Sequence, residues 1–354
     1  MSKIVYLALA PLALFALGAL WGCGSDAPPA PSAAKAPLAS ASQKAQSPLS
    51  ETSSKPTTVL KVPFPSEPTA PSVFIVGHEL GFFKKRGVEL DFVGVIPTTQ
   101  LVAAVVSGQI DVSHGSHVNR TIAGVSAGAK ILAVVAGTET TQRVPHMTAI
   151  VPKNSPIKTP QDLLGKKVGL PTIGGCNEYT PYAWLDKNGV SDPKTKIEVT
   201  VVAEKNLEQV LRQGEIDLAM MHKIPEEILK KGEFDVVFSD YDVWGPDGGN
   251  TPQYFSIQYI KDHPEAVQAF VAAVAETHNW ANANPKGAME ITARRTGQDI
   301  NRIAERFYAP DGLIKPETVE VWIQLLTHFG EIKPGISLDR IYTNEFNPHY
   351  QKAS

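Results

Sequence analysis

Short apolar runs alternate with helix-forming stretches along most of the chain, and no other feature of the sequence constrains the fold as strongly. Strands separated by helices form right-handed βαβ crossovers, which produce mostly parallel sheets with helices on both faces. The predicted fold class is therefore α/β, with two lobes. The strands of the first lobe are predicted at residues 59–62, 88–95, 110–113 and 131–136. Those of the second set are predicted at residues 147–151, 167–170, 197–202, 216–220, 236–238 and 254–260.

The last third of the chain reads as helical. Helices are predicted there at residues 264–282, 285–296, 299–307 and 316–329. Because no strands separate these helices, we expect them to pack back onto an existing lobe.

Charge and cysteine content exclude several classes of protein. The chain has 33 Lys and Arg residues against 36 Asp and Glu residues, a net charge of −3. Nucleic-acid-binding proteins usually carry a strong basic excess, so this class is disfavoured. Two cysteines cannot form a disulfide framework, which means that packing must hold the fold together.

The N-terminus has the pattern of a lipoprotein signal peptide over residues 1–22. Lys3 precedes an uncharged apolar stretch at residues 4–20, followed by Trp21, Gly22 and Cys23. This ending resembles the bacterial lipobox and predicts that Cys23 is lipidated and becomes the first residue of the mature chain. Several acyl chains would anchor it stably, palmitate being a typical one. A retained transmembrane anchor is the alternative, because such a stretch could nearly cross a bilayer.

Residues 23–56 are predicted to form a disordered tether. Residues 24–56 hold 8 Ala, 8 Ser and 6 Pro and no aromatic residue, so they lack the apolar bulk that offsets chain entropy. The expected location of the protein is the cell membrane, with the folded body held on the extracytoplasmic side.

Five segments in order resemble the sulfonate, taurine and nitrate type of periplasmic substrate-binding protein, the NMT1/THI5-like group. These segments are PSVFIVGHELGFFKKRGVELDFVGV, LVAAVVSGQIDVSHGS, KNSPIKTPQDLLGKKVGLPTIGG, VLRQGEIDLAMM and DHPEAVQAFVAAVAETHNWANANPKGAMEI. The resemblance implies a type II periplasmic binding protein fold, whose two lobes are joined by two crossing strands. Residues 57–148 and 253–354 would form lobe 1, and residues 149–252 would form lobe 2.

The same resemblance implies a function without catalysis. Such proteins capture a small molecule between their lobes and deliver it to the permease and ATPase subunits of an ABC importer. We therefore expect a monomer that binds a small-molecule ligand and no cofactor. A small organic anion such as a sulfonate is the first candidate for that ligand.

Candidate ligand contacts lie in loops that follow predicted strands, where ligands bind in open α/β sheets. Turn formation by Ser66, helix capping by Ser116 and a local backbone contact of His222 are the alternative interpretations. The candidate contacts are Ser66, Glu67, His114, Ser116, Thr138, Thr172, Gly174, Gly175, His222, Tyr241 and Trp244.

No metal site and no nucleophile are predicted. His114 and His117 are three residues apart across a predicted strand-to-helix junction, which favours structural roles. Cys176 has no identifiable His or Asp partner in the sequence, so it is interpreted as a buried packing residue.

Two other ligands or functions compete with the organic anion. Tyr241 and Trp244 at the predicted hinge favour a planar heterocycle, such as a pyrimidine or flavin precursor. The cleft loops contain no evident Arg, which disfavours a doubly charged anion. An enzyme similar to the pyrimidine synthases of thiamine biosynthesis is disfavoured, because the Cys-rich motif of those enzymes is absent.

Overall fold

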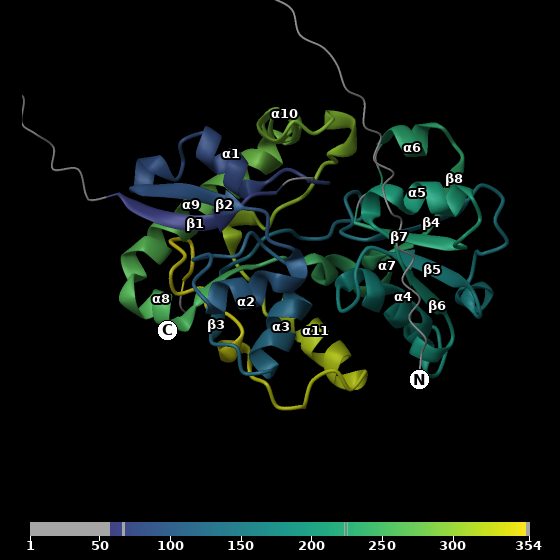
Figure 1. Ribbon diagram of the computed structural model, residues 1–354. Helices are drawn as coiled ribbons and strands as arrows, with labels where there is room; N and C mark the ends of the chain where they lie inside the picture. The colour runs from purple at the N-terminus through teal and green to yellow at the C-terminus, as the bar shows by residue number, and fades with distance from the viewer. Residues whose placement is uncertain (1–56, 66–67, 223, 225, 352–354) are drawn as a thin grey trace, which may run out of the picture. The chain divides into compact units, whose positions relative to one another are not determined.

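The computed structural model describes residues 57–65, 68–222, 224 and 226–351. The proposed signal peptide, tether and lipidation site at Cys23 lie outside the described residues, as do Ser66 and Glu67. The strands are β1 (Thr58–Pro63), β2 (Val88–Gly94), β3 (Ile131–Val135), β4 (Thr148–Pro152), β5 (Lys167–Leu170), β6 (Glu198–Val201), β7 (Leu218–Met221), β8 (Phe234–Ser239) and β9 (Gln253–Ser256) (Figure 1). The α-helices are α1 (Val73–Glu79), α2 (Leu101–Val106), α3 (Val118–Ser126), α4 (Cys176–Lys187), α5 (Glu204–Arg212), α6 (Glu226–Lys230), α7 (Asp240–Trp244), α8 (Ile257–Asp262), α9 (Pro264–Ala283), α10 (Pro285–Thr296) and α11 (Glu317–His328).

Two short sheets are formed by the first three strands of the described chain and the last one. β1 pairs with β2 in parallel, and β3 pairs with β9 in an antiparallel register. Long helix α9 packs against α1 and β3. Between these elements, Phe74, Phe83 and Phe270 form an aromatic core in which the rings of Phe74 and Phe270 meet edge to face at 5.7 Å. Such aromatic burial is a major source of stability for this part of the fold.

A five-stranded sheet forms the middle of the chain, with strand order β6-β5-β7-β4-β8. β5 runs parallel to β6 and β7, whereas β4 runs antiparallel to β7 and β8. Helix α5 packs on one face of this sheet and α4 on the other (Figure 1). The prediction of mostly parallel sheets therefore holds around β5, and the antiparallel pairs come from β4, the first strand of this sheet in the chain.

Two crossing segments connect the outer elements to the five-stranded sheet. One runs from β3 to β4, and the other returns from β8 to β9. They lie in direct contact: a Cβ atom added to Gly137 would come within 2.0 Å of the backbone oxygen of Thr251. Thr138 Oγ1 donates a hydrogen bond to the carbonyl oxygen of Gly249 at 2.6 Å. The two connections are thus held together where the chain passes between the sheets.

Three predicted elements differ from the structure. Residues 110–113 form only an isolated bridge between Val112 and Phe255. The strand predicted to end at residue 260 ends at Ser256, because the Ser256 hydroxyl accepts a hydrogen bond from Tyr259 N and caps α8. The helix predicted at residues 299–307 shrinks to a short 3₁₀ turn, Ile300–Arg302.

Helix α7 was not predicted. Its start has a capping box, in which Asp242 accepts hydrogen bonds from the backbone and the hydroxyl of Ser239 at 2.7 and 2.8 Å. Among the described residues, no helix combines the length and the hydropathy that crossing a bilayer requires.

Candidate functional site

A cavity of about 700 Å³ opens where several strand-end loops converge. Thr172 follows β5 and His222 follows β7, while Pro65 follows β1. His114 and Arg306 complete the polar wall. Ligands of open α/β sheets bind at such carboxyl ends of strands, and this volume is typical of small-molecule sites.

The structure places three of the candidate contacts, His114, Thr172 and His222, in the cavity wall. Pro65 and Pro68, which flank the undescribed Ser66 and Glu67, also line the cavity. Most of the other candidates lie elsewhere. Those outside the cavity wall are Ser116, Thr138, Gly174, Gly175, Tyr241 and Trp244.

Several of these other candidates have structural contacts instead. Thr138 binds the carbonyl oxygen of Gly249 at the crossing segments. The ring of Trp244 packs with its centroid 4.6 Å from that of Trp322 on α11, and Trp244 does not line the cavity. Nothing on α7 therefore provides the aromatic lid that the sequence suggested for a planar ligand.

Arg306 is a wall residue that the sequence did not reveal. Its guanidinium donates hydrogen bonds to the backbone carbonyl oxygens of Pro145, His146 and His222 at 3.1–3.2 Å. The side chain is only 6% exposed, and burial lowers the pKa of Arg306 from its usual value. The expectation that no Arg lies near the cleft was wrong, because residues 303–307 do not continue as a helix and turn toward the cavity.

Glu204 and His222 form an ion pair in the same wall. Glu204 Oε2 lies 2.6 Å from His222 Nδ1, and Glu204 Oε1 accepts a 2.7 Å hydrogen bond from His222 N. Burial by itself would lower the pKa of His222, but the Glu204 carboxylate and the Cys176 sulfur outweigh it and raise the pKa to about 10. Burial favours the neutral form of Glu204, yet His222 lowers the pKa of that carboxyl. The pair is therefore an imidazolium and a carboxylate at neutral pH.

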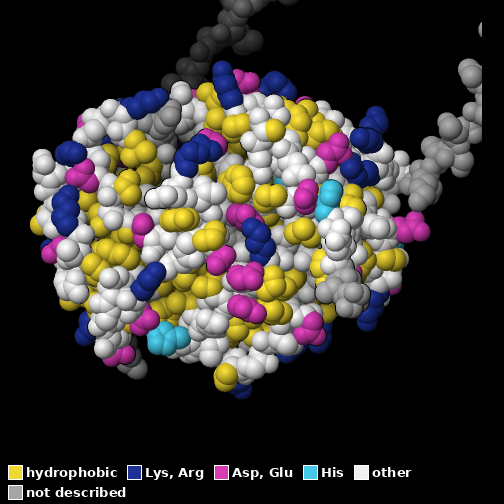
Figure 2. All heavy atoms as spheres, turned by 180° about the vertical axis from the view of Figure 1, so that it is seen from behind, with side chains coloured by type: hydrophobic (Ala, Val, Ile, Leu, Met, Phe, Trp, Pro, Cys, Tyr) yellow, Lys and Arg dark blue, Asp and Glu magenta, His cyan; other side chains and the backbone are white. Residues whose placement is uncertain are grey.

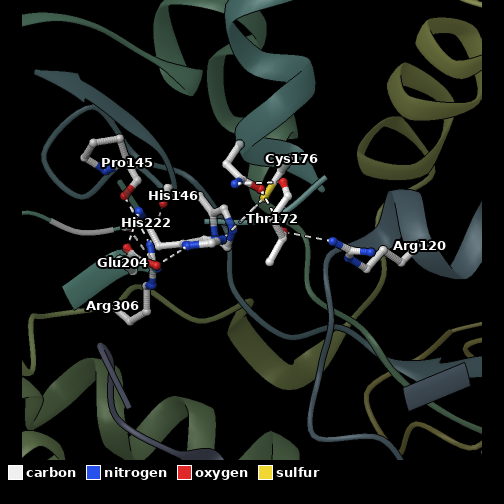
Figure 3. A network of polar contacts seen from close by, with 9 residues as sticks. Arg120, Pro145, His146, Thr172, Cys176, Glu204, His222 and Arg306 are labelled. Carbon is white, nitrogen blue, oxygen red and sulfur yellow. Dashed lines mark hydrogen bonds and ion pairs between the residues drawn. The ribbon is translucent and has the colours of Figure 1, made fainter. Parts of the chain in front are cut away.

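Figure 3 shows how Arg306 lies beside this pair, with Thr172 farther along the wall. Cys176 is the first residue of α4 and is 2% exposed. Its Sγ lies 3.6 Å from His146 Nε2 and 3.7 Å from His222 Nε2. Cys176 is buried, as predicted, but it has two histidine neighbours, which sequence inspection missed because they come from segments 30 and 46 residues away.

The other histidines described near Cys176 or the cavity, His114, His117 and His146, are held neutral. Burial lowers the pKa of His117 to about 3, and it lowers that of His146 well below the usual value. His117 Nε2 donates to the carbonyl oxygen of Gly248 at 2.8 Å. Burial also lowers the pKa of His114.

The loop after β5 contacts α3 through Arg120. Arg120 Nη2 donates to Thr172 Oγ1 and to the carbonyl oxygen of Ile173, both at 3.0 Å (Figure 3). Asn119 Nδ2 donates to the carbonyl oxygen of Gly174 at 3.1 Å. Gly174 adopts a φ of 72°, which favours glycine and lets the loop turn toward these donors.

Charge on the outer surface is mixed. On the face shown in Figure 2, acidic and basic side chains are interspersed among apolar ones. The cavity wall differs from that face because it holds the buried guanidinium of Arg306, together with the partly exposed His222 imidazolium and its partner Glu204.

Comparison with known proteins places these features in context. The family described as NMT1/THI5 like matches residues 70–288. Among curated proteins, no sequence matches this chain. The alkanesulfonate-binding protein SsuA from Xanthomonas axonopodis pv. citri, solved bound to MOPS, superposes with a TM-score of 0.62 at 17% identity and covers 82% of this chain and 100% of its own.

Two other solved structures show how the same fold serves different proteins. A ligand-binding component of an ABC-type import system from Staphylococcus aureus, solved with zinc bound, has a TM-score of 0.67 at 14% identity and covers 84% of this chain and 100% of its own. The desulfurization enzyme DSZB has a TM-score of 0.59 at 15% identity and covers 82% of this chain and 97% of its own. The chain thus has the two-lobed fold of type II periplasmic binding proteins.

Proposed function

Because the chain belongs to the NMT1/THI5-like family, we propose that it is an extracytoplasmic solute-binding protein that delivers a small organic anion to an ABC importer. The ligand binds in the cavity between the strand-end loops and is passed to the permease and ATPase subunits. The proposal includes a monomer with lobes at residues 57–148 plus 253–354 and at residues 149–252. It also includes a lipid anchor on Cys23.

The observation that carries this proposal is the buried Arg306 in the cavity wall. Three backbone carbonyls fix the guanidinium in place, and the nearby carboxylate of Glu204 is already paired with His222. The combined wall therefore carries positive charge that an anion neutralises. The Thr172 hydroxyl, which also lines the cavity, supplies a neutral hydrogen-bonding group for an anionic oxygen.

A sulfonate fits this wall better than a planar heterocycle does. Tyr241 and Trp244, the reason for expecting a flat ligand, are absent from the residues that line the cavity. A single tetrahedral anionic head group can accept several hydrogen bonds from separate donors, and charge-assisted bonds of this kind are the strong ones.

Binding without catalysis is the favoured activity, although DSZB shows that an enzyme can have this fold. Cys176 is the free thiol among the described residues, and it is buried and does not line the cavity. A nucleophile must reach its substrate. Cys176 is therefore poorly placed to attack a ligand held beside Arg306.

The test is a thermal-shift screen of the full chain against alkanesulfonates, carboxylates and pyrimidines. A ligand at a hundredfold excess over its Kd should stabilise the protein by about 2.7 kcal/mol.

Arg306→Gln should weaken sulfonate binding by roughly 10- to 100-fold, since a hydrogen bond to a charged group contributes about 1.5–3 kcal/mol. Arg340→Gln, which removes an exposed guanidinium outside the cavity, should leave binding unchanged.

A shift with uncharged pyrimidines but none with sulfonates or carboxylates would contradict the proposed ligand class. If Arg306→Gln does not fold, Arg306→Lys provides a second variant, because lysine keeps the positive charge. Thr172→Val, at the surface of the loop after β5, tests the hydroxyl donor separately.

A further inference from the structure

Three imidazoles and one thiol converge beside the cavity. We call His117, His146, Cys176 and His222 the Cys-His cluster. One ring nitrogen each of His117 and His146 and the Cys176 sulfur all lie within 4.8 Å of one another, and all three residues are buried. His222 reaches the same sulfur from the cavity wall (Figure 3).

The distances around the sulfur fit two ligands of one tetrahedral metal ion. A zinc ion lies about 2.3 Å from thiolate sulfur and about 2.0–2.1 Å from imidazole nitrogen. Tetrahedral angles then place a sulfur and a nitrogen roughly 3.6 Å apart. Cys176 Sγ lies 3.6 Å from His146 Nε2, which matches this separation, and a ring nitrogen of His117 lies within 4.8 Å of both ligand atoms.

The outer nitrogens of the histidines are already engaged, as they are in most metal-binding histidines. His222 Nδ1 donates to the Glu204 carboxylate at 2.6 Å. His146 Nδ1 lies 3.4 Å from Thr138 Oγ1, which uses its own proton on the Gly249 carbonyl and so accepts from the ring. These contacts turn Nε2 of both rings toward Cys176.

Proton counting supports the same conclusion. With His222 as the imidazolium, its Nε2–H donates to the sulfur and the thiol donates to His146 Nε2, so two protons link these groups when no metal is bound. Metal binding requires a thiolate and a free His146 Nε2. The ion therefore takes the place of the thiol proton that lies between Cys176 and His146.

We propose that Cys176, His117 and His146 bind a borderline-soft transition-metal ion such as Zn²⁺, with His222 as a neighbour of the bound thiolate. Thiolate and imidazole are the ligands that select zinc over Mg²⁺ or Ca²⁺. The ligands come from the first crossing segment, the start of α4 and the start of α3, so the ion ties three separate elements together. This site goes beyond the proposed capture of an organic anion and does not depend on it.

The test uses full-length protein that has no polyhistidine tag and has been treated with a chelator. Titration with Zn²⁺ should show one ion bound per chain by elemental analysis. Co²⁺ should give tetrahedral d–d bands and a sulfur-to-metal charge-transfer band. Cys176→Ser should lose the charge-transfer band, and Cys23→Ala should keep it because that variant retains Cys176.

Further variants test how much single side chains contribute to the Zn²⁺ affinity. His146→Gln should lower the Zn²⁺ affinity by more than about tenfold, and Thr138→Val by about 10- to 100-fold, since losing an outer partner of a ligand typically costs this much. His328→Gln, an exposed histidine outside the cluster, should bind Zn²⁺ like the wild type.

The proposal is overturned if the protein takes up no stoichiometric Zn²⁺, or if Cys176→Ser retains the charge-transfer band. Circular dichroism of each variant separates loss of the site from loss of the fold, and His146→Gln keeps the proposal testable if Cys176→Ser does not fold. Sulfonate binding, measured on the same samples, reports separately on the proposed function.

Discussion

His278 is a buried imidazole on α9 that contacts the segment after Tyr308. Its Nδ1 donates to the carbonyl oxygen of Ala309 at 3.1 Å, and its ring stacks on Tyr308 with centroids 5.0 Å apart. Nε2 has no hydrogen-bond partner among the described residues. Burial lowers the pKa of His278 to about 4, so the folded protein holds this ring neutral.

Acid should therefore destabilise the protein partly through His278. In the unfolded chain the ring binds a proton near pH 6.5, whereas in the folded chain it does so only near pH 4. The unfolded state binds more protons in this interval, so the contribution is complete above pH 6.5 and is lost as the pH falls toward 4. The loss amounts to about 3 kcal/mol.

His278→Gln should flatten the pH dependence of the free energy of unfolding between pH 7 and 4, measured by urea denaturation at each pH. His263→Gln, which changes an exposed ring, should retain the wild-type dependence. An unchanged acid sensitivity in His278→Gln would show that other buried groups dominate, for example His114, His117 and His146, whose pKa values burial also lowers.

At the scale of single residues, Cys176 and Arg306 have contacts that the sequence did not predict. Local sequence around each residue contains no signal of its partners, which lie 30–160 residues away. His114, Thr172 and His222 line the cavity, because each follows a strand or an extended run whose end is recognisable locally, and their contact with a ligand stays a prediction. Residue type and strand position can be read from the chain, but pairing across elements requires the tertiary structure.

The two crossing segments approach each other so closely that no room is left for a side chain at Gly137. Gly137 faces Thr251, and a Cβ atom at Gly137 would lie 2.0 Å from the Thr251 backbone oxygen and 2.4 Å from its Oγ1. A backbone atom cannot move aside as the end of a side chain can. The close approach therefore requires glycine at this position.

Gly137→Ala should destabilise the protein by about 1–3 kcal/mol, the usual cost of overpacking a well-packed interior. Urea denaturation should show a lower midpoint with an unchanged slope. Gly124→Ala is the matched control, because its Cβ would meet only side chains, Val102 at 3.1 Å and Ile131 at 3.8 Å, and alanine gains about 1 kcal/mol of helix propensity in α3. Equal destabilisation by both changes would contradict the argument.

Helix α11 connects the cluster to the rest of the molecule. Trp322 is fully buried, its ring lies 4.4 Å from that of His117, and its Nε1 donates to the Gly248 carbonyl oxygen at 3.0 Å. The same carbonyl oxygen accepts from His117 Nε2. A predicted late helix thus packs back onto the first set of elements, and it also buttresses a residue proposed to bind metal.

At the scale of the whole molecule, lipidation decides where the folded body works. If Cys23 is the attachment point, cells that express the full chain should incorporate labelled palmitate into it, and globomycin should block its processing. Cys23→Ala should incorporate no label, whereas Cys176→Ser should incorporate it normally, because Cys176 is buried in the folded body. Labelling of Cys23→Ala would contradict the lipoprotein assignment.

The sequence alone determined the fold class, the family and most element positions, since alternating apolar runs, caps and turn residues act over a few neighbouring residues. It also located the loops from which the cavity is built. Only the tertiary structure decided which side chains meet there: Arg306 with the cavity, Glu204 with His222, and Cys176 with two histidines. Those contacts depend on how the crossing segments bring distant elements together. Local sequence patterns do not specify that arrangement, because they reflect interactions between residues that are close in the chain.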